Sequence, residues 1–170
     1  MNKYNIDINA VLIKPIYIGL LINALIPVAI VGIAYLLEQS GGITSSMSPE
    51  NLELVFYIFI GLGVADGGLA IFLKQKLFFS PLIKSRESFA GDFMHGFFSK
   101  SIVCYAIIAA IAIYGLVIYI LGGTFNQLLF LVLMSFIAFQ IIRPRAKFAE
   151  KVLAAQEQLV EQGQFLSDKK

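Results

Sequence analysis

Asp66 is the residue with the clearest chemical potential in this sequence, because it is the one charged residue in the interior of any membrane-length apolar segment. A charged side chain near the centre of a bilayer costs about 2.5–3.5 kcal/mol on insertion scales, and such residues usually pair with another group or line a functional path. Asp66 lies in the glycine-rich stretch of residues 61–68 (GLGVADGG). It is therefore a candidate proton or cation carrier, or alternatively a neutral group whose hydrogen bond holds two helices together.

Two other polar residues are expected at the depth of Asp66. Counting about 1.5 Å per residue from the basic residues that flank each segment places Asp66, Asn23 and Ser135 roughly 12 Å from one end. Pro27 lacks an amide hydrogen and clashes with the carbonyl four residues before it, which belongs to Asn23. A carboxylate, an amide, a hydroxyl and a freed carbonyl predict a site for a proton, a small cation or a packing contact.

Metal, haem and nucleophile chemistry lack the residues they need. His95 is the only histidine and Cys104 the only cysteine, so neither has a second nitrogen or sulfur donor of its own kind. No histidine lies in an apolar segment, where it could activate Cys104 or Ser135 as a nucleophile. We expect no metal, no cofactor and no enzymatic activity.

One short stretch resembles an enzyme motif. Asp66-Gly67-x-x-Ala70 resembles the opening of the motif of CDP-alcohol phosphotransferases, which continues with an arginine and further aspartates. Ile71 stands at the arginine position and the later aspartates are missing, so we reject this interpretation. A membrane enzyme ranks third among the functions considered.

Four apolar segments must position these residues, at 16–37, 52–73, 102–121 and 125–142. Each is close to the roughly 20 residues that a membrane-spanning helix needs. The 170 residues are 58% hydrophobic and 14% charged, whereas soluble proteins average about 25% charged residues. We predict an all-α fold whose main domain, residues 1–143, is a four-span transmembrane helical bundle in the lipid bilayer. A net charge of +2 gives no indication of nucleic-acid binding.

Basic residues predict the orientation of the bundle. The first and third connections between segments contain no Lys or Arg. The basic residues instead flank the N-terminus, the middle connection and the C-terminal end: Lys3, Lys14, Lys74, Lys76, Lys84, Arg86, Lys100, Arg143, Arg145, Lys147 and Lys151. Cytoplasmic loops carry such an excess. We expect an integral protein, of the cytoplasmic membrane of a prokaryote, with both termini in the cytoplasm.

Two amphipathic segments lie outside the four spans. In the middle connection Phe89, Phe93 and Phe97 share one helical face, which predicts an interfacial helix with its aromatic side in the acyl boundary, or alternatively an aromatic-rich loop packed on the bundle. Residues 144–170 predict a cytoplasmic C-terminal helix, from about residue 145 to 166. Its apolar face is expected to dock on a partner or on the bundle, and consists of Phe148, Val152, Leu159 and Leu166.

Glycines near Asp66 predict close helix packing. Small residues let helix backbones approach each other in lipid. Gly63 and Gly67 lie near Asp66 on the helical wheel, and Gly61 and Gly68 form a second small-residue stripe with Ala65. All four glycines are therefore candidate packing positions, within the chain or between chains.

Residues 112–118 (AIYGLVI) carry a second family resemblance. They resemble the end of the second helix of the proteolipid c subunits of rotary ATP synthases, and the glycines of residues 61–68 are similar to the first helix of that family. The resemblance covers the second and third spans and implies ion translocation through a carboxylate. The position of the family's carboxylate is occupied here by Ala109, so Asp66 on the neighbouring helix would have to take its place.

Together these patterns favour a non-enzymatic accessory or structural subunit of a larger integral membrane complex. Glycine stripes, aromatic interface segments and an apolar tail face offer surfaces for other membrane subunits or for a second copy of the chain. The alternative is proton or cation translocation through Asp66.

Overall fold

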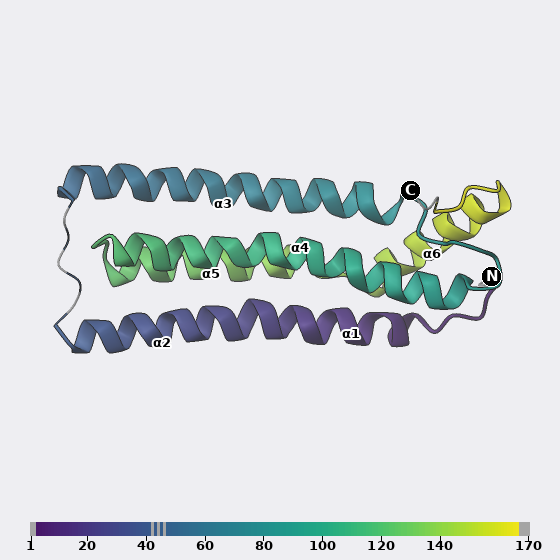
Figure 1. Ribbon diagram of the computed structural model, residues 1–170, viewed down its shortest axis with the longest axis horizontal. Helices are drawn as coiled ribbons and strands as arrows, with labels where there is room; N and C mark the ends of the chain where they lie inside the picture. Colours follow the sequence, from purple (N-terminus) through teal and green to yellow (C-terminus); the bar gives the residue numbers. More distant parts are fainter. Residues whose placement is uncertain (1–2, 42, 44, 46, 167–170) are drawn as a thin grey trace.

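The computed structural model describes residues 3–41, 43, 45 and 47–166. All regular elements in this part of the chain are helices, and four of them are long and apolar enough to cross a membrane. Figure 1 shows these helices running along the long axis of the molecule, with the short helix α6 at one end, near the N-terminus. The expected membrane-embedded helical fold is therefore confirmed at this level. Lys170, at the end of the expected tail, lies outside the described residues.

The first span is one continuous helical stretch, Ile8–Gln39, that changes its winding in the middle. It consists of α1 (Ile8–Leu20), a five-residue π-helical segment η1 (Leu21–Leu25) and α2 (Ile26–Gln39). The π segment lies directly before Pro27, whose ring disturbs the preceding helical turn. π-bulges commonly absorb such disturbances inside helices.

Two of the other spans, α3 and α5, begin at residues whose side chains cap the helix. α3 (Pro49–Phe78) follows Ser48, whose hydroxyl accepts a hydrogen bond from the Asn51 amide. α5 (Phe125–Ile142) begins with a capping box in which the Thr124 and Gln127 side chains each accept the other residue's amide. α5 coincides with the fourth predicted span.

The third span, α4 (Phe89–Ile120), is the central helix of the bundle. It packs along α5 on one side and contacts α3 and the α1–α2 helix, which lie on opposite sides of it in Figure 1. Gly115 makes the closest approach to α5, since a Cβ there would lie 3.0 Å from the Leu128 carbonyl oxygen and 3.3 Å from the Leu131 Cβ. The absence of a side chain at Gly115 therefore sets the spacing of these two helices.

The first third of α4 corrects the expectation of a separate interfacial helix. At about 1.5 Å per residue, the 32 residues of α4 measure roughly 48 Å, longer than a hydrocarbon core of about 30 Å. Its aromatic side chains Phe89, Phe93 and Phe97 are buried in protein and do not face the acyl boundary. Phe89 stacks on Tyr4 of the N-terminal segment and on Phe93, while the Phe97 ring is tilted against Phe93 and meets Phe78 of α3 edge to face. The aromatic residues therefore pack on the bundle, as in the second alternative, but they do so as part of a helix and not of a loop.

α6 (Ala146–Glu161) closes the same end of the bundle. Of the four predicted face residues, Val152 is fully buried, Phe148 and Leu159 are half-buried, and Leu166 lies beyond the helix and is 43% exposed. The buried face is completed by residues outside the predicted set: Ala149, Leu153, Gln156 and Val160. The tail helix therefore docks on its own chain, and the predicted heptad positions were partly wrong because α6 packs against several short segments and not along one partner helix.

Gln156 is the buried polar residue that attaches α6 to the bundle. Its Oε1 accepts the Leu82 amide at 3.0 Å, and its Nε2 lies 3.0 Å from the Phe78 carbonyl oxygen and 2.9 Å from the Ser80 carbonyl oxygen. One side chain thus satisfies backbone groups at the end of α3 and in the following loop, which would otherwise be buried without partners.

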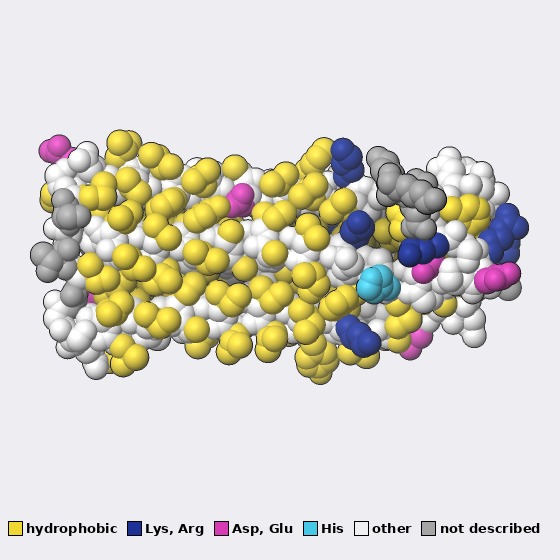
Figure 2. All heavy atoms as spheres, in the orientation of Figure 1, with side chains coloured by type: hydrophobic (Ala, Val, Ile, Leu, Met, Phe, Trp, Pro, Cys, Tyr) yellow, Lys and Arg dark blue, Asp and Glu magenta, His cyan; other side chains and the backbone are white. Residues whose placement is uncertain are grey.

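The Lys and Arg residues flank the apolar segments, whereas Asp66 lies within one of them. On the face shown in Figure 2, hydrophobic side chains cover the middle of the rod and basic side chains appear only towards the end that carries α6. We call this end, with α6, the loop 79–88 and the residues before α1, the basic end. Large apolar side chains such as Leu54, Val64 and Phe72 are exposed along the spans. Soluble proteins rarely expose so large an apolar surface, whereas contact with lipid accounts for it.

Candidate functional site

Asp66 forms a hydrogen bond with Tyr114 of the central helix. The Tyr114 hydroxyl donates to Asp66 Oδ2 at 2.7 Å, and both side chains are half-buried. Phe59, two turns before Asp66 on α3, stacks on the Tyr114 ring with centroids 5.4 Å apart and an interplanar angle of 8°. Two residues on one face of α3 therefore hold Tyr114, one through its ring and the other through its hydroxyl. A phenol can donate to a carboxyl group that is either ionised or protonated.

Asn23 and Ser135 do not join Asp66. The Asn23 amide donates to the Gly19 carbonyl of its own helix at 3.1 Å, and the Ser135 hydroxyl donates to the Ile108 carbonyl at 3.0 Å. Asn23 and Asp66 also lie on helices on opposite sides of α4. The expected gathering of the three residues is not found, because counting residues estimates depth but does not say which way a side chain points around its helix.

A different polar pair lies in the bundle interior, next to Gly19. A Cβ at Gly19 would lie 2.7 Å from the Tyr105 ring and 2.9 Å from the Phe139 ring, so α1 and α4 meet closely here. Asn23 Oδ1 in η1 and the Tyr105 hydroxyl in α4 are buried and have no hydrogen-bond partner among the described residues.

The glycines of α3 face in different directions. A Cβ at Gly63 would collide with the Met134 side chain and lie 3.1 Å from Ile111, so Gly63 is a packing position within the chain. A Cβ at Gly61, Gly67 or Gly68 would meet nothing within 4 Å. Three of the four predicted packing glycines therefore make no helix contact inside the chain.

A second tyrosine–carboxylate contact, which sequence reasoning missed, lies nearer the C-terminal end of α4. The Tyr119 hydroxyl lies 2.6 Å from Glu38 Oε2 and 3.0 Å from the Ala34 carbonyl oxygen, and so joins α4 to α2. A tyrosine five residues from Tyr114 in a central helix is the only signal that could have suggested it. Tyrosine hydroxyls thus connect α4 to the helices on both of its sides.

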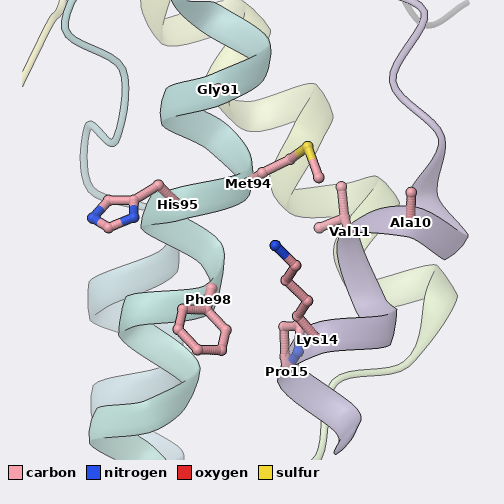
Figure 3. A pocket seen from close by; sticks show the side chains of 8 residues that line it. All are labelled: Ala10, Val11, Lys14, Pro15, Gly91, Met94, His95 and Phe98. Carbon is pink, nitrogen blue, oxygen red and sulfur yellow. The ribbon is translucent and has the colours of Figure 1, made fainter. Parts of the chain in front are cut away.

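His95 borders a cavity of about 410 Å3 between α1 and α4. Figure 3 shows the Lys14 side chain extending from α1 into the space between these helices, while the His95 ring points away from α1. The remaining lining is mainly apolar and includes Val11, Met94 and Phe98. Among the described residues, no three His, Cys, Asp or Glu side chains lie close enough together to hold a metal ion.

A groove of about 560 Å3 runs along the other side of the first span. It is lined by Asn23, Pro27 and Val28 together with Leu133 and Phe136 of α5. Apart from Asn23 these side chains are apolar, and the unpaired Asn23 oxygen is buried, so the groove has the character of a lipid-facing surface between helices.

Comparison of the chain with protein-family models, with curated proteins and with solved structures finds no match.

Proposed function

We propose that this chain is a non-enzymatic accessory or structural subunit of a larger integral membrane complex. The observation that carries the proposal is the unused small-residue face of α3. The buried residues Gly63 and Ala70 mark the side of α3 that packs on the bundle. By the helical period of 3.6 residues, Gly61, Ala65 and Gly68 lie on the opposite side, and the structure leaves them exposed.

A physical argument favours a partner helix on this face. Small residues at a spacing of three and four let a second backbone come close, which favours association where lipid tails compete for apolar surfaces. The partner in this proposal is another membrane subunit or a second copy of the chain.

The test is isolation of the complex from native membranes in a mild detergent, followed by mass spectrometry of the proteins that accompany the chain. We expect unrelated subunits in fixed ratio with the wild type, and their loss with Gly61→Leu or Gly68→Leu. Gly32→Leu is the matched control, because Gly32 is an equally open glycine on α2. Migration of the wild-type chain alone, or equal loss with the control, would contradict the proposal.

Ion translocation through Asp66 is the second candidate. It is favoured by one observation, the hydrogen bond to Tyr114, since this tyrosine lies in the stretch that resembles c subunits. Asn23 and Ser135 form their hydrogen bonds elsewhere, which leaves the carboxylate without the other expected ligands. Proton or sodium flux into reconstituted vesicles separates the two functions. Flux that is lost in Asp66→Asn would favour the carrier, whereas the accessory proposal expects no flux in the wild type.

The proposed orientation places the basic end in the cytoplasm of a prokaryotic cell. It is supported by the excess of lysine and arginine at that end and by the absence of both from the first and third connections.

A further inference from the structure

The corner where α3, α5 and α6 meet contains a pocket of about 530 Å3. Five of its seven lining residues are basic: Lys74, Arg143, Arg145, Lys147 and Lys151. They come from α3, from α6 and from the link between α5 and α6, so the tertiary structure brings together charges that are separated by up to 77 positions in the sequence.

No acidic residue lines this pocket. The only ion pair among the described residues is Lys3–Glu161, which lies elsewhere at the basic end. Arg143, Arg145, Lys147 and Lys151 are exposed, and no hydrogen bond of their side chains to another described residue is found. Like charges at this density repel one another, and a bound anion relieves the repulsion.

The backbone adds to the positive potential of the pocket. α6 begins at Ala146, directly beside the cluster, and no side chain caps its first amides. The start of a helix carries a partial positive charge and free amide donors, and it is a favourable place for a phosphate oxygen. Lys74 connects the walls of the pocket. Its ammonium donates to the Ile142 carbonyl of α5 at 2.7 Å and lies 4.5 Å from the centre of the Phe148 ring of α6.

The remaining lining residues are apolar and indicate the kind of molecule that fits. Ile141, which is 59% exposed, belongs to the last turn of α5, and Phe148 covers the adjacent wall. The pocket therefore joins the end of the apolar surface to a cluster of cations. Basic pockets between membrane helices commonly bind anionic lipid head groups.

We propose that this pocket binds the phosphate group of an anionic ligand, with an anionic phospholipid as the source that the apolar lining favours. The basic side chains and the first amides of α6 contact the phosphate, and Ile141 and Phe148 contact the glycerol and acyl portion. A soluble phosphate shares the chemistry of the head group and lacks the apolar portion, so the two sources can be separated by experiment.

The test uses the full chain purified in mild detergent, with binding followed by native mass spectrometry and by the shift in melting temperature. The probes are phosphatidylglycerol, phosphatidylcholine and inorganic phosphate. We expect phosphatidylglycerol to bind better than phosphatidylcholine. The triple variant Arg143→Gln, Arg145→Gln, Lys147→Gln should bind phosphatidylglycerol about 100-fold more weakly, if each cation contributes about as much as a basic residue near an anionic membrane.

The matched control is Lys76→Gln, Lys84→Gln, Arg86→Gln, which removes the same charge from the same end of the bundle but outside the pocket. It should retain wild-type binding within a few-fold. If the triple variant does not fold, the single exposed substitution Lys147→Glu, which changes the charge by two, should weaken phosphatidylglycerol binding about 30-fold. Binding of inorganic phosphate without a preference for phosphatidylglycerol would assign the site to a soluble phosphate. Equal binding of both lipids and no phosphate binding, or equal losses in pocket variant and control, would overturn the proposal.

Discussion

Asp66 of α3 and Tyr114 of α4 are joined by a 2.7 Å hydrogen bond, so the one charged residue in the interior of the apolar segments connects a peripheral helix to the central helix. The bond lies beside the stacked rings of Phe59 and Tyr114. α3 has few other buried residues, and they are widely spaced: Leu52, Gly63, Ala70 and Phe78. Among the described residues, the Asp66–Tyr114 contact is one of three side-chain hydrogen bonds that join α3 to α4 or α5, beside Lys74–Ile142 and Cys104–Ala70.

If this contact serves helix packing, substitutions of the donor Tyr114 and of the acceptor Asp66 should lower the free energy of unfolding by different amounts. Tyr114→Phe removes the donor and should cost about 0.6 kcal/mol, the average for polar contacts between membrane helices. Asp66→Asn keeps an oxygen that accepts the tyrosine hydroxyl and should cost less than Asp66→Ala. Unfolding in mixed detergent micelles, arranged as a double-mutant cycle with Tyr114→Phe, measures the pair. Equal losses for Asn and Ala at position 66 would contradict the packing role.

Gly115 should be far less tolerant of a methyl group than other glycines of the bundle. A Cβ at Gly115 would lie 3.0 Å from the Leu128 carbonyl oxygen, and this backbone atom cannot move without separating α4 from α5. Gly115→Ala should lower the free energy of unfolding by about 1–3 kcal/mol, as overpacking typically does. In the control Gly32→Ala the added Cβ meets nothing within 4 Å, and alanine favours a helix by about 1 kcal/mol over glycine. We expect the control to be unchanged or slightly more stable in the same unfolding assay.

Gln156 should control the attachment of α6. Gln156→Leu replaces the amide side chain by an apolar one. The Leu82 amide and the Phe78 and Ser80 carbonyls are then left without their partner. Each such group costs about 1–3 kcal/mol where it stays buried. Hydrogen exchange should therefore become faster at the Leu82 amide and throughout α6, while the spanning helices remain protected. Gln158→Leu, at an exposed position of the same helix, is the control. Unchanged exchange in Gln156→Leu would show that apolar contacts alone hold α6.

The proposed orientation predicts that Lys84 and Lys151 face the cytoplasm, while Glu50 and Gln127 face the other side. Because Cys104 is the only cysteine and is buried, single cysteines introduced at these positions can be labelled with little background. A membrane-impermeant maleimide added to intact cells should react at positions 50 and 127 and reach positions 84 and 151 only after the membrane is opened. Labelling of residues 50 and 151 from the same side would contradict the orientation.

Much of the architecture follows from the chain itself, because the length of an apolar run and the position of a charge are local properties. The fourth predicted span coincides with Phe125–Ile142, the first two lie inside longer helices, and the third, 102–121, extends one residue past the end of the longer helix Phe89–Ile120. The separation of basic residues from the first and third connections is likewise visible in the sequence and reappears as the basic end of the folded molecule. Burial of Val152 was also predictable, because α6 has polar residues on its other side, which mark the apolar face of a helix in water.

The direction that each membrane helix faces could be decided only by the tertiary structure. Lipid tails are as apolar as leucine, so the lipid-facing and core-facing sides of a spanning helix have nearly the same composition. That is why Gly63 and Gly68, five positions apart in the same helix, could not be sorted into a packed and an open glycine. For the same reason the partner of Asp66 proved to be Tyr114, which the depth count had not selected, and not Asn23 or Ser135. The basic pocket also needed the fold, since Lys74 lies far from Arg143 and Lys151 in sequence and meets them only where α3, α5 and α6 converge.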